Sequence, residues 1–475
     1  MPTRRHLIAL AGGATVAASA GSLARPRYSA DAASLNAHPL PRWFDDAKFG
    51  IFIHWGLYSV PAFAPFGPNG HPGTPDTNRY NPYAEWYANT MQFPESETAA
   101  YHRATYGEAP YAQFAVPFEA AAARADYTQW ARVFAASGAR YVTLVTKHHD
   151  GFALWPSDVA NPYRPGWHSR TDIVGKLAAA VRAEHMRFGT YYSGGLDWTF
   201  NPARVDNGGA MMRSMPRDDA YDAYVLGQYR ELIARVSPDY LWNDIGYPTR
   251  TSALALAAEF YAGNPQGLIN DRWIPARETF SGSVEEQRAR LQVFGKWLAQ
   301  HRPPPPEHYD VITPEYAADL QPLEKKWEAT RGIGFSFGYN ARETDAQLLS
   351  AAGIVRLLAD CVAKGGNLLL NTGPRGDGTL CPMQVERLLA VGQWLGHSGE
   401  AIHATRPWHT PAATAADGRT LRFTTKGTRL YATVLEGGTT FPAGTGNAAV
   451  DTAVDAARAR PLGPDNGMPR AWRLA

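Results

Sequence analysis

The chain has 475 residues, of which 45% are hydrophobic, 12% aromatic and 19% charged, and this much apolar material excludes a disordered chain. Lysine and arginine total 46 against 44 aspartate and glutamate residues, so no charge excess points to nucleic acid or an acidic polymer as a partner. Two cysteines are too few for a disulfide scaffold or a cysteine-based zinc site. The 14 Trp, 23 Tyr and 19 Phe suit a protein that stacks on a neutral, partly apolar ligand, although a large core also uses such rings.

Residues 1–24 have the features of an export signal. The pair Arg4-Arg5 precedes an apolar stretch of small residues over 7–20, and a small-x-small sequence follows. The paired arginines resemble a twin-arginine signal, which carries folded proteins across a bacterial inner membrane. An uncleaved anchor is the alternative, but glycines interrupt the stretch, and no later one reaches ~20 uninterrupted apolar residues. We therefore expect a periplasmic or extracellular protein with no membrane contact in its mature form, and residues 25–40 as a flexible leader.

From residue 43 onward, short apolar runs alternate with longer amphipathic segments. Strands are expected over residues 49–54, 140–146, 187–192, 239–242, 267–270 and 367–371, with a further short apolar run at 332–337. Helices are expected over residues 118–137, 172–185, 218–236, 252–262, 345–363 and 382–395. This alternation indicates a parallel sheet with crossover helices, and the number of units favours a closed (β/α)8-like barrel. An open doubly wound sheet is the alternative.

The barrel is assigned to residues 41–404. Within it, residues 276–307 are expected to form an inserted segment that is helical over 285–301 and ends in four prolines. The remaining residues, 405–475, are expected to form a small β-module. From residue 448 onward no clear period is visible, so no strands are expected there.

Polar and aromatic residues follow the ends of several predicted strands. In a βα barrel, the reacting groups project from the C-terminal ends of the strands and from the loops after them. These strand ends are His54-Trp55, Lys147-His148-His149-Asp150, Tyr191-Tyr192-Ser193, Asn243-Asp244, Asn270-Asp271-Arg272-Trp273 and Asn371-Thr372. The pattern predicts a site rich in His, Trp, Tyr and carboxylate groups.

The adjacent His148 and His149 raise the question of a metal. A zinc ion needs three or four ligands around one point, and neighbouring strand residues point to opposite faces unless the strand has ended. The sequence has neither a His-x-His nor a His-Glu-x-x-His spacing. We therefore expect no metal, and interpret the imidazoles as hydrogen-bond partners of ligand hydroxyls, with strand capping as the alternative.

Asp244 is the candidate nucleophile, because it ends a strand close to the ring of Trp242. A serine nucleophile fits less well, since Ser193-Gly194-Gly195 lacks the Gly-x-Ser-x-Gly elbow. A carboxylate in such a low-dielectric place needs hydrogen bonds, for example from His148 or Tyr191. A helix N-cap is the alternative role for Asp244.

Sequence blocks in order over about residues 40–408 resemble the retaining α-L-fucosidases of glycoside hydrolase family 29. The blocks are Trp43-Phe44 with residues 48–56, then 85–87, 147–152, 241–244, 270–273, 327–328 with 331–340, and 365–371. The resemblance implies a βα barrel followed by a C-terminal β-sandwich, which the short module here would form incompletely. It also implies exo-acting hydrolysis of terminal α-L-fucosyl bonds, without a cofactor, on a fucosylated oligosaccharide or glycoconjugate.

The resemblance further implies Asp244 as nucleophile and Glu315 as acid/base, with Glu324, Glu328 and Asp319 as rivals for the second role. Retention requires two carboxyl groups about 5–5.5 Å apart, the second of them protonated at first. The positions that match the family's sugar pocket are His54, Glu85, Trp86, His148, His149, Tyr191, Trp242, Arg272 and Phe337. The alternatives are a non-catalytic fucose-binding protein on the same barrel, and a related glycosidase that acts on galactosides.

Overall fold

The structure, a computed structural model, describes residues 28–66, 81–279, 286, 305–316, 321–454 and 458–474. The predicted export signal and the helix expected over 285–301, apart from residue 286, lie outside these ranges, as does Asp319. Among the described residues, no helix is both long enough and apolar enough to cross a membrane.

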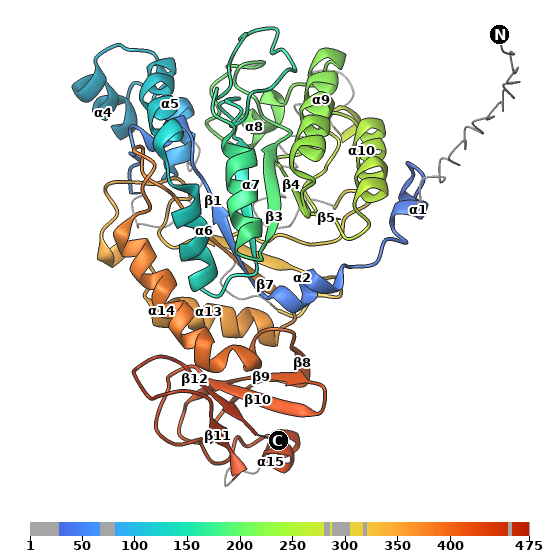
Figure 1. The fold of residues 1–475 in the computed structure, drawn as a ribbon, viewed down its shortest axis with the longest axis vertical. Helices are drawn as coiled ribbons and strands as arrows, with labels where there is room; N and C mark the ends of the chain where they lie inside the picture. Colours follow the sequence, from blue (N-terminus) through green and yellow to red (C-terminus); the bar gives the residue numbers. More distant parts are fainter. Residues whose placement is uncertain are drawn as a thin grey trace, which may run out of the picture.

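Parallel strands form a central sheet that curls into a partial barrel (Figure 1). Its seven strands are β1 (Phe49–Ile53), β2 (Tyr141–Lys147), β3 (Arg187–Ser193), β4 (Tyr240–Asp244), β5 (Leu268–Ile269), β6 (Glu328–Gly332) and β7 (Asn367–Thr372). They lie in the order β5-β4-β3-β2-β1-β7-β6, and every neighbouring pair is parallel. The predicted parallel sheet is therefore confirmed, although the apolar run at 332–337 follows β6 instead of forming a strand.

An irregular segment over residues 310–316 closes the ring between β5 and β6. On one side, the amides of Asp310 and Val311 donate to the Ile269 carbonyl at 3.0 and 3.3 Å. On the other side, the Thr330 amide of β6 donates to the Pro314 carbonyl at 2.9 Å. Because this closing segment bonds to both edge strands, it occupies the place of an eighth strand. The expectation of a (β/α)8-like barrel is confirmed, and the open sheet is not.

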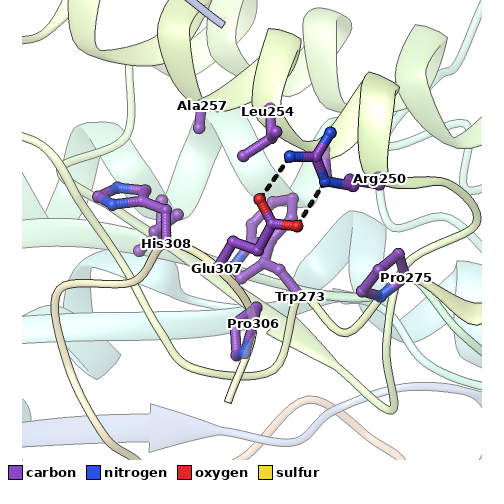
Figure 2. A pocket seen from close by; sticks show the side chains of 10 residues that line it. Arg250, Leu254, Ala257, Trp273, Pro275, Pro306, Glu307 and His308 are labelled. Carbon is purple, nitrogen blue, oxygen red and sulfur yellow. Dashed lines mark hydrogen bonds and ion pairs between the residues drawn. The ribbon is translucent and has the colours of Figure 1, made fainter. Parts of the chain in front are cut away.

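An ion pair anchors the chain that enters the closing segment (Figure 2). Arg250 of α10 (Arg250–Gly263) binds both carboxylate oxygens of Glu307, at 2.5 and 2.6 Å. Beside this pair lies a cavity of about 30 Å³ lined in part by Trp273 and His308.

Helices on the outside of the sheet connect the strands. The longer ones are α4 (Glu97–Tyr106), α5 (Ala115–Arg124), α6 (Tyr127–Ala136), α7 (Ile173–Ala183), α9 (Asp219–Val236), α10, α13 (Ala351–Ala363) and α14 (Pro382–Ser398). Shorter helices and 3-10 turns are α1 (Ala32–Leu35), α2 (Arg42–Ala47), η1 (Leu57–Ser59), η2 (Ala84–Trp86), α3 (Tyr87–Thr90), η3 (Tyr111–Phe114), α8 (Gly208–Ser214), α11 (Ala276–Thr279), η4 (Asp345–Gln347) and η5 (Gly399–Ala401). The single helix predicted over 118–137 is two helices, because Asp126 caps α6 by accepting from the Gln129 amide at 2.8 Å.

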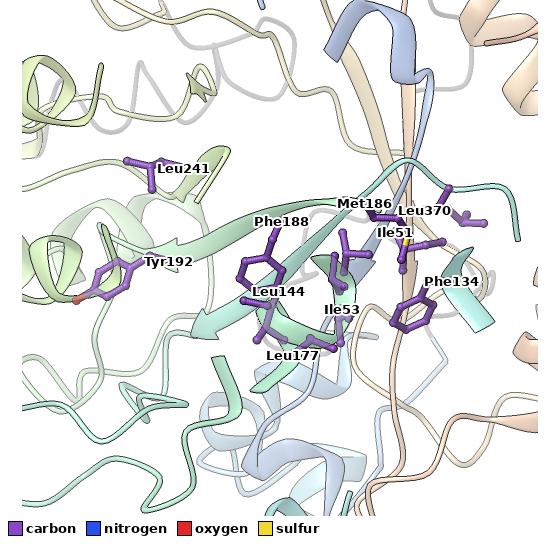
Figure 3. Packing of buried hydrophobic residues seen from close by; sticks show 14 of the residues in the cluster. Ile51, Ile53, Phe134, Leu144, Leu177, Met186, Phe188, Tyr192, Leu241 and Leu370 are labelled. Atoms are coloured by element: carbon purple, nitrogen blue, oxygen red, sulfur yellow. The ribbon is translucent and has the colours of Figure 1, made fainter. Parts of the chain in front are cut away.

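Side chains alternate along the strands between two apolar layers. Ile51 and Ile53 of β1 point outward and pack against the helices, together with Leu144 of β2 (Figure 3). Phe52 between them belongs to the barrel interior, where the rings of Tyr191 and Trp242 lie 5.7 and 5.3 Å from its own. Each such fully buried side chain contributes about 1.5–3 kcal/mol. Large aromatic rings thus fill the interior of the barrel.

The segment expected as a flexible leader packs against the barrel from Tyr28 onward. Leu35 is fully buried, and His38 stacks on Tyr261 with ring centroids 3.9 Å apart. His38 Nδ1 also lies 2.9 Å from an Asp310 carboxylate oxygen. The structure differs from the expectation because this short segment carries apolar and ring residues that find partners on α10 and on the closing segment.

The C-terminal module is one antiparallel sheet of five strands in the order β11-β12-β10-β9-β8. The strands are β8 (Arg406–Thr414), β9 (Thr420–Lys426), β10 (Arg429–Val434), β11 (Arg460–Pro461) and β12 (Arg470–Arg473), and α15 (Ala448–Ala453) precedes the last two. The expectation of no strands after residue 448 is wrong, because Ala471 and Trp472 pair with β10 and are buried. In the described part of the chain no second sheet faces this one; α13 and α14 pack against it instead of completing a β-sandwich.

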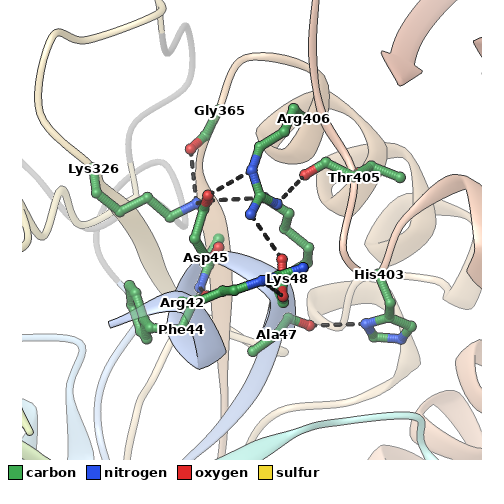
Figure 4. Close-up of polar contacts among 12 residues, drawn as sticks. Arg42, Phe44, Asp45, Ala47, Lys48, Lys326, Gly365, His403, Thr405 and Arg406 are labelled. Carbon is green, nitrogen blue, oxygen red and sulfur yellow. Dashed lines mark hydrogen bonds and ion pairs between the residues drawn. The ribbon is translucent and has the colours of Figure 1, made fainter. Parts of the chain in front are cut away.

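A charged cluster joins the barrel to this module (Figure 4). Asp45 of α2 accepts from Lys48 Nζ at 3.1 Å and from Lys326 Nζ at 2.8 Å. Arg406, the first residue of β8, binds the other Asp45 oxygen at 2.8 Å. Burial, together with the charge of Lys326, lowers the pKa of Lys48 to about 7. The cluster lies at the N-terminal ends of the strands, opposite the predicted site.

Candidate active site

The side chains predicted from the sequence gather at the carboxyl ends of the barrel strands. Their positions are His54 after β1, His148 and His149 after β2, Tyr191 in β3, Trp242 and Asp244 in β4, Arg272 after β5, Glu315 in the closing segment, Phe337 after β6, and Glu85 and Trp86 in η2. Ring contacts of 4.9 to 5.9 Å connect His54 with Phe337, His148 and Tyr191, and His148 with Tyr191. The structure therefore places these residues in one site, while their individual roles remain predictions.

Asp244 is buried and held by three donors. Tyr191 Oη donates to Oδ2 at 2.6 Å, and Arg272 Nη1 and the Ile245 amide donate to Oδ1, each at 2.9 Å. Burial would raise the pKa of this carboxyl, but Arg272, nearby His149 and the Tyr191 hydrogen bond outweigh burial and lower it. Asp244 is therefore an ionised carboxylate at neutral pH. Its predicted hydrogen bond comes from Tyr191, and the N-cap alternative fails because the helix after β4 is capped by Thr249.

Glu315 lies across the same arginine. Its Oε1 is 2.6 Å from Arg272 Nη1, the nitrogen that also contacts Asp244 at 2.9 Å. The separation of Asp244 Oδ1 and Glu315 Oε1 therefore cannot exceed the sum of these two distances. The Glu315 side chain is 34% exposed, against 10% for Asp244, so Glu315 is on the open side of the site.

The two carboxyl groups have opposite pKa shifts. Partial burial of its carboxyl, and then the charge of Asp244, raise the pKa of Glu315, although Arg272 opposes both. Arg272 itself is fixed by Thr313, whose hydroxyl and carbonyl oxygens accept from Nε and Nη2 at 3.1 and 2.9 Å. One group is thus kept ionised and the other is biased towards its protonated form, the combination that acid–base chemistry needs.

The described rivals of Glu315 lie elsewhere. Glu328 begins β6 at the opposite end of the barrel, where it accepts from the hydroxyls of Tyr141 and Tyr240. Burial raises its pKa to about 7. Glu324 is exposed on the chain before β6. Glu315 is therefore the only one of these three that faces Asp244.

His148 and His149 converge because β2 ends at Lys147, after an irregularity in its pairing between Val145 and Lys147. Their ring centroids are 3.9 Å apart, and both side chains are buried. Within the described ranges, no group of three or more His, Cys, Asp or Glu side chains is arranged to hold a metal ion. His148 Nδ1 is buried and has no hydrogen-bond partner among the described atoms.

Neighbouring groups determine the tautomers of two histidines. The Asn371 amide nitrogen donates to the Phe337 carbonyl at 2.6 Å, so its oxygen, 2.6 Å from His54 Nδ1, accepts from that nitrogen. Ser193 Oγ donates to the Leu196 carbonyl at 2.7 Å, so His149 Nδ1, 2.7 Å away, must be its donor. Burial lowers the pKa of His54 to about 3 and that of His149 to about 4. Each neutral ring therefore leaves Nε2 as a hydrogen-bond acceptor.

Glu85 complements these acceptors as a donor. It is 2% exposed, and its Oε2 accepts from the Gly338 amide at 2.7 Å. Burial raises its pKa to about 8, and the charge of Glu315 adds to the effect, so the group is largely protonated at pH 7. Next to it, the Trp86 ring lies edge-on to His149 with centroids 5.1 Å apart.

Phe337 lies in a turn after β6, within the apolar run over residues 332–337. Glu343 Oε1 accepts from the amides of Phe335 and Ser336 at 2.7 and 2.8 Å, which fixes the backbone next to Phe337. Such a carboxylate-bridged turn favours loop geometry over a strand, which is why β6 ends at Gly332.

Two tyrosines at the rim of the site were not predicted. Tyr316 stacks on Tyr83 with centroids 6.1 Å apart, and both rings lie within 5.5 Å of Phe337. Tyr316 directly follows Glu315, so adjacency to a candidate acid could have identified it. Tyr83 lies in a region rich in Pro, Gly and Asn, where no periodic pattern identifies a site residue.

Paired carboxyl groups beside aromatic rings, at the carboxyl ends of a βα barrel, are the arrangement expected of a glycoside hydrolase. A family model for alpha-L-fucosidase matches residues 15–400 of the chain. Among curated proteins, rat tissue alpha-L-fucosidase is 32% identical over 434 residues, which cover 88% of this chain and 81% of the rat protein. The human tissue alpha-L-fucosidase is 31% identical over 424 residues, 86% of this chain and 78% of the human protein. The chain therefore belongs to the alpha-L-fucosidase family, glycoside hydrolase family 29.

Solved structures agree with this assignment. A Thermotoga maritima alpha-fucosidase superposes with a TM-score of 0.74 at 42% identity, over 87% of each chain. An alpha-L-fucosidase isoenzyme from Paenibacillus thiaminolyticus gives a TM-score of 0.62 at 25% identity, over 91% of this chain and 94% of that one.

Proposed function

We propose that this protein is an exo-acting, retaining α-L-fucosidase that hydrolyses terminal α-L-fucosyl bonds of oligosaccharides or glycoconjugates, with Asp244 as nucleophile and Glu315 as acid/base. The observation that carries the proposal is the shared contact of both carboxylates with Arg272 Nη1. It keeps their nearest oxygens within the roughly 5–5.5 Å that separates the two carboxyl groups of retaining glycosidases.

In the first step, Glu315 gives its proton to the glycosidic oxygen as the bond from that oxygen to the anomeric carbon breaks. An Asp244 oxygen attacks the same carbon from the opposite face and forms a glycosyl ester. In the second step, Glu315 takes a proton from water, and the water oxygen displaces Asp244 from the anomeric carbon. Two inversions give net retention, and both carboxyl groups return to their starting states.

The electrostatics of the site suit this change of role. The charge of Asp244 is one of the causes that raise the pKa of Glu315. Because the ester has no charge, that cause disappears once the intermediate forms, and the pKa of Glu315 falls. The group is thus an acid before the intermediate and a base after it.

The remaining side chains fit a deoxy sugar. Acceptors at Nε2 of His54 and His149 and a donor at Glu85 match the hydroxyls of one sugar face. A sugar hydroxyl would also give His148 Nδ1 the partner that it lacks. The rings of Trp242 and Phe337 offer an apolar surface for the C5 methyl, where the hydroxymethyl of a galactoside would need a polar partner.

Replacement of Asp244 by glycine tests the proposal. We expect Asp244→Gly to lose hydrolysis of an aryl α-L-fucoside, and azide to restore turnover as the β-fucosyl azide. NMR of the wild-type reaction should show α-fucose as the first product. First release of the β-anomer, or full activity of the variant, would overturn the mechanism, and faster turnover of aryl galactosides would overturn the substrate.

The predicted signal leads us to propose export, with a periplasmic or extracellular mature protein. Mass spectrometry of the processed N-terminus in the secreting host tests this: a chain that keeps residues 1–24 in the cytoplasm would refute it.

A further inference from the structure

Two asparagines join the strands that carry Asp244 and Arg272. β5 has only two residues, and its last backbone pairing with β4 is Leu241 to Ile269. Beyond this point, the Asn270 side chain accepts from the Asn243 amide at 3.0 Å and donates to the Asn243 carbonyl at 2.8 Å. An amide side chain thus continues the ladder where the short strand has ended.

The Asn243 side chain extends this connection towards the two charged groups. Its Nδ2 donates to the Gly246 carbonyl at 2.9 Å and to the Arg272 carbonyl at 2.8 Å, and its Oδ1 accepts from the Tyr229 hydroxyl at 2.8 Å. Carbonyl oxygens only accept, so the orientation of the amide is determined. Asn243 is fully buried, so water does not substitute for these bonds.

The turn after Asp244 requires such support. Ile245 has φ +61°, a left-handed conformation that is unusual for a β-branched residue, and Gly246 has φ +111°. A Cβ at Gly246 would lie 2.6 Å from Met215 Cε and 2.9 Å from the Ile274 carbonyl. The Asp244 carbonyl is also fixed, by the amides of Gly194 and Gly195 at 3.2 Å each. A backbone in this conformation persists only where its surroundings determine it.

We propose that Asn243 is a positioning residue, which holds the turn after Asp244 and the backbone of Arg272 at a fixed separation and so sets the contact between these two side chains. This role rests on the proposed function, because it acts through the nucleophile. The Asn243 side chain bonds to two backbone carbonyls and to the Tyr229 hydroxyl.

The test is Asn243→Ala, which introduces no charge. We expect kcat on an aryl α-L-fucoside to fall on the order of 10²-fold, the effect of a misplacement near 1 Å, with little change in KM. The acid limb of the kcat/KM profile should move to higher pH, because Arg272 then stabilises the Asp244 carboxylate less. A purely structural role would lower thermal stability and leave this limb in place.

The matched control is Asn367→Ala. Asn367 is also fully buried, and its amide donates to the Phe44 carbonyl at 2.8 Å, but it begins β7 at the opposite end of the barrel. We expect it to lower Tm without moving the acid limb. If Asn243→Ala does not fold, Tyr229→Phe removes one bond to the same amide and should move the limb in the same direction by less.

The outcomes separate the two proposals. An active wild-type protein whose Asn243→Ala and Tyr229→Phe variants keep both kcat and the acid limb would overturn the positioning role alone. A wild-type protein without fucosidase activity would overturn the proposed function and the positioning role with it.

Discussion

The two ends of the barrel interior each bury a carboxyl group, and the groups have opposite character. At the carboxyl ends of the strands, Asp244 contacts Arg272 and has a lowered pKa. At the other end, Glu328 is bonded to the hydroxyls of Tyr141 and Tyr240, and burial raises its pKa to about 7. Burial alone therefore favours the neutral acid, and a buried carboxylate nucleophile requires a cation to remain ionised.

The largest expected effect separates these two acids. Asp244→Asn should reduce kcat/KM on an aryl α-L-fucoside by on the order of 10⁴-fold, the scale seen when one member of a catalytic set is removed. Glu328→Gln, the same chemical change at the other end, should leave kcat/KM close to that of the wild type. Steady-state kinetics of both purified variants provide the comparison, and comparable losses would mean that Glu328 takes part in the reaction.

The next effect depends on the leaving group. Glu315→Ala should lose about 10²- to 10⁴-fold in kcat/KM on fucosides whose leaving group is a sugar hydroxyl, because such a group needs protonation to depart. On aryl fucosides of acidic phenols, the variant should lose much less rate in the first step, because the phenolate departs without a proton. A series of leaving groups of graded pKa measures this slope, and equal losses along the series would remove the acid/base role from Glu315.

A smaller effect concerns the charge between the two acids. Arg272 lowers the pKa of both Asp244 and Glu315. In Arg272→Met, both pKa values should rise, so the acid and the base limbs of the kcat/KM profile should both move to higher pH. The remaining rate should fall by on the order of 10²-fold, as after loss of one electrostatic contact. Movement of one limb only would contradict the shared contact.

The alternation of strands and helices, and the polar residues at strand ends, were predictable because the period of the apolar residues and their order along the chain determine both. Asp244 followed from its place at the end of a strand. Glu315 followed only from the family resemblance, since the closing segment forms isolated pairings with β5 and β6 and has no periodic pattern.

Other features depend on partners far apart in the chain. The leader packs because His38 meets Asp310, and β12 forms because Trp472 pairs with Ala432. Neither contact follows from local composition. The tautomers of His54 and His149 depend in the same way on distant partners, because each is determined by the further hydrogen bond that Asn371 or Ser193 donates to a backbone carbonyl.

The smallest effect is on stability and returns to Glu328. Its pKa is about 7 in the folded protein, against 4.5 as its ordinary value. A raised pKa gives stability that is fully present below the ordinary value and is lost as pH rises through about 7, at about 1.4 kcal/mol per pKa unit. Glu328→Gln has no such proton, so its Tm relative to the wild type should rise between pH 5 and pH 8. Other buried acids, such as Glu85, are common to both proteins and cancel in this difference. A constant Tm difference over that range would show that Glu328 is ionised in the folded protein as it is in the unfolded one, and the contrast between the two ends of the barrel would then lie in their partners alone.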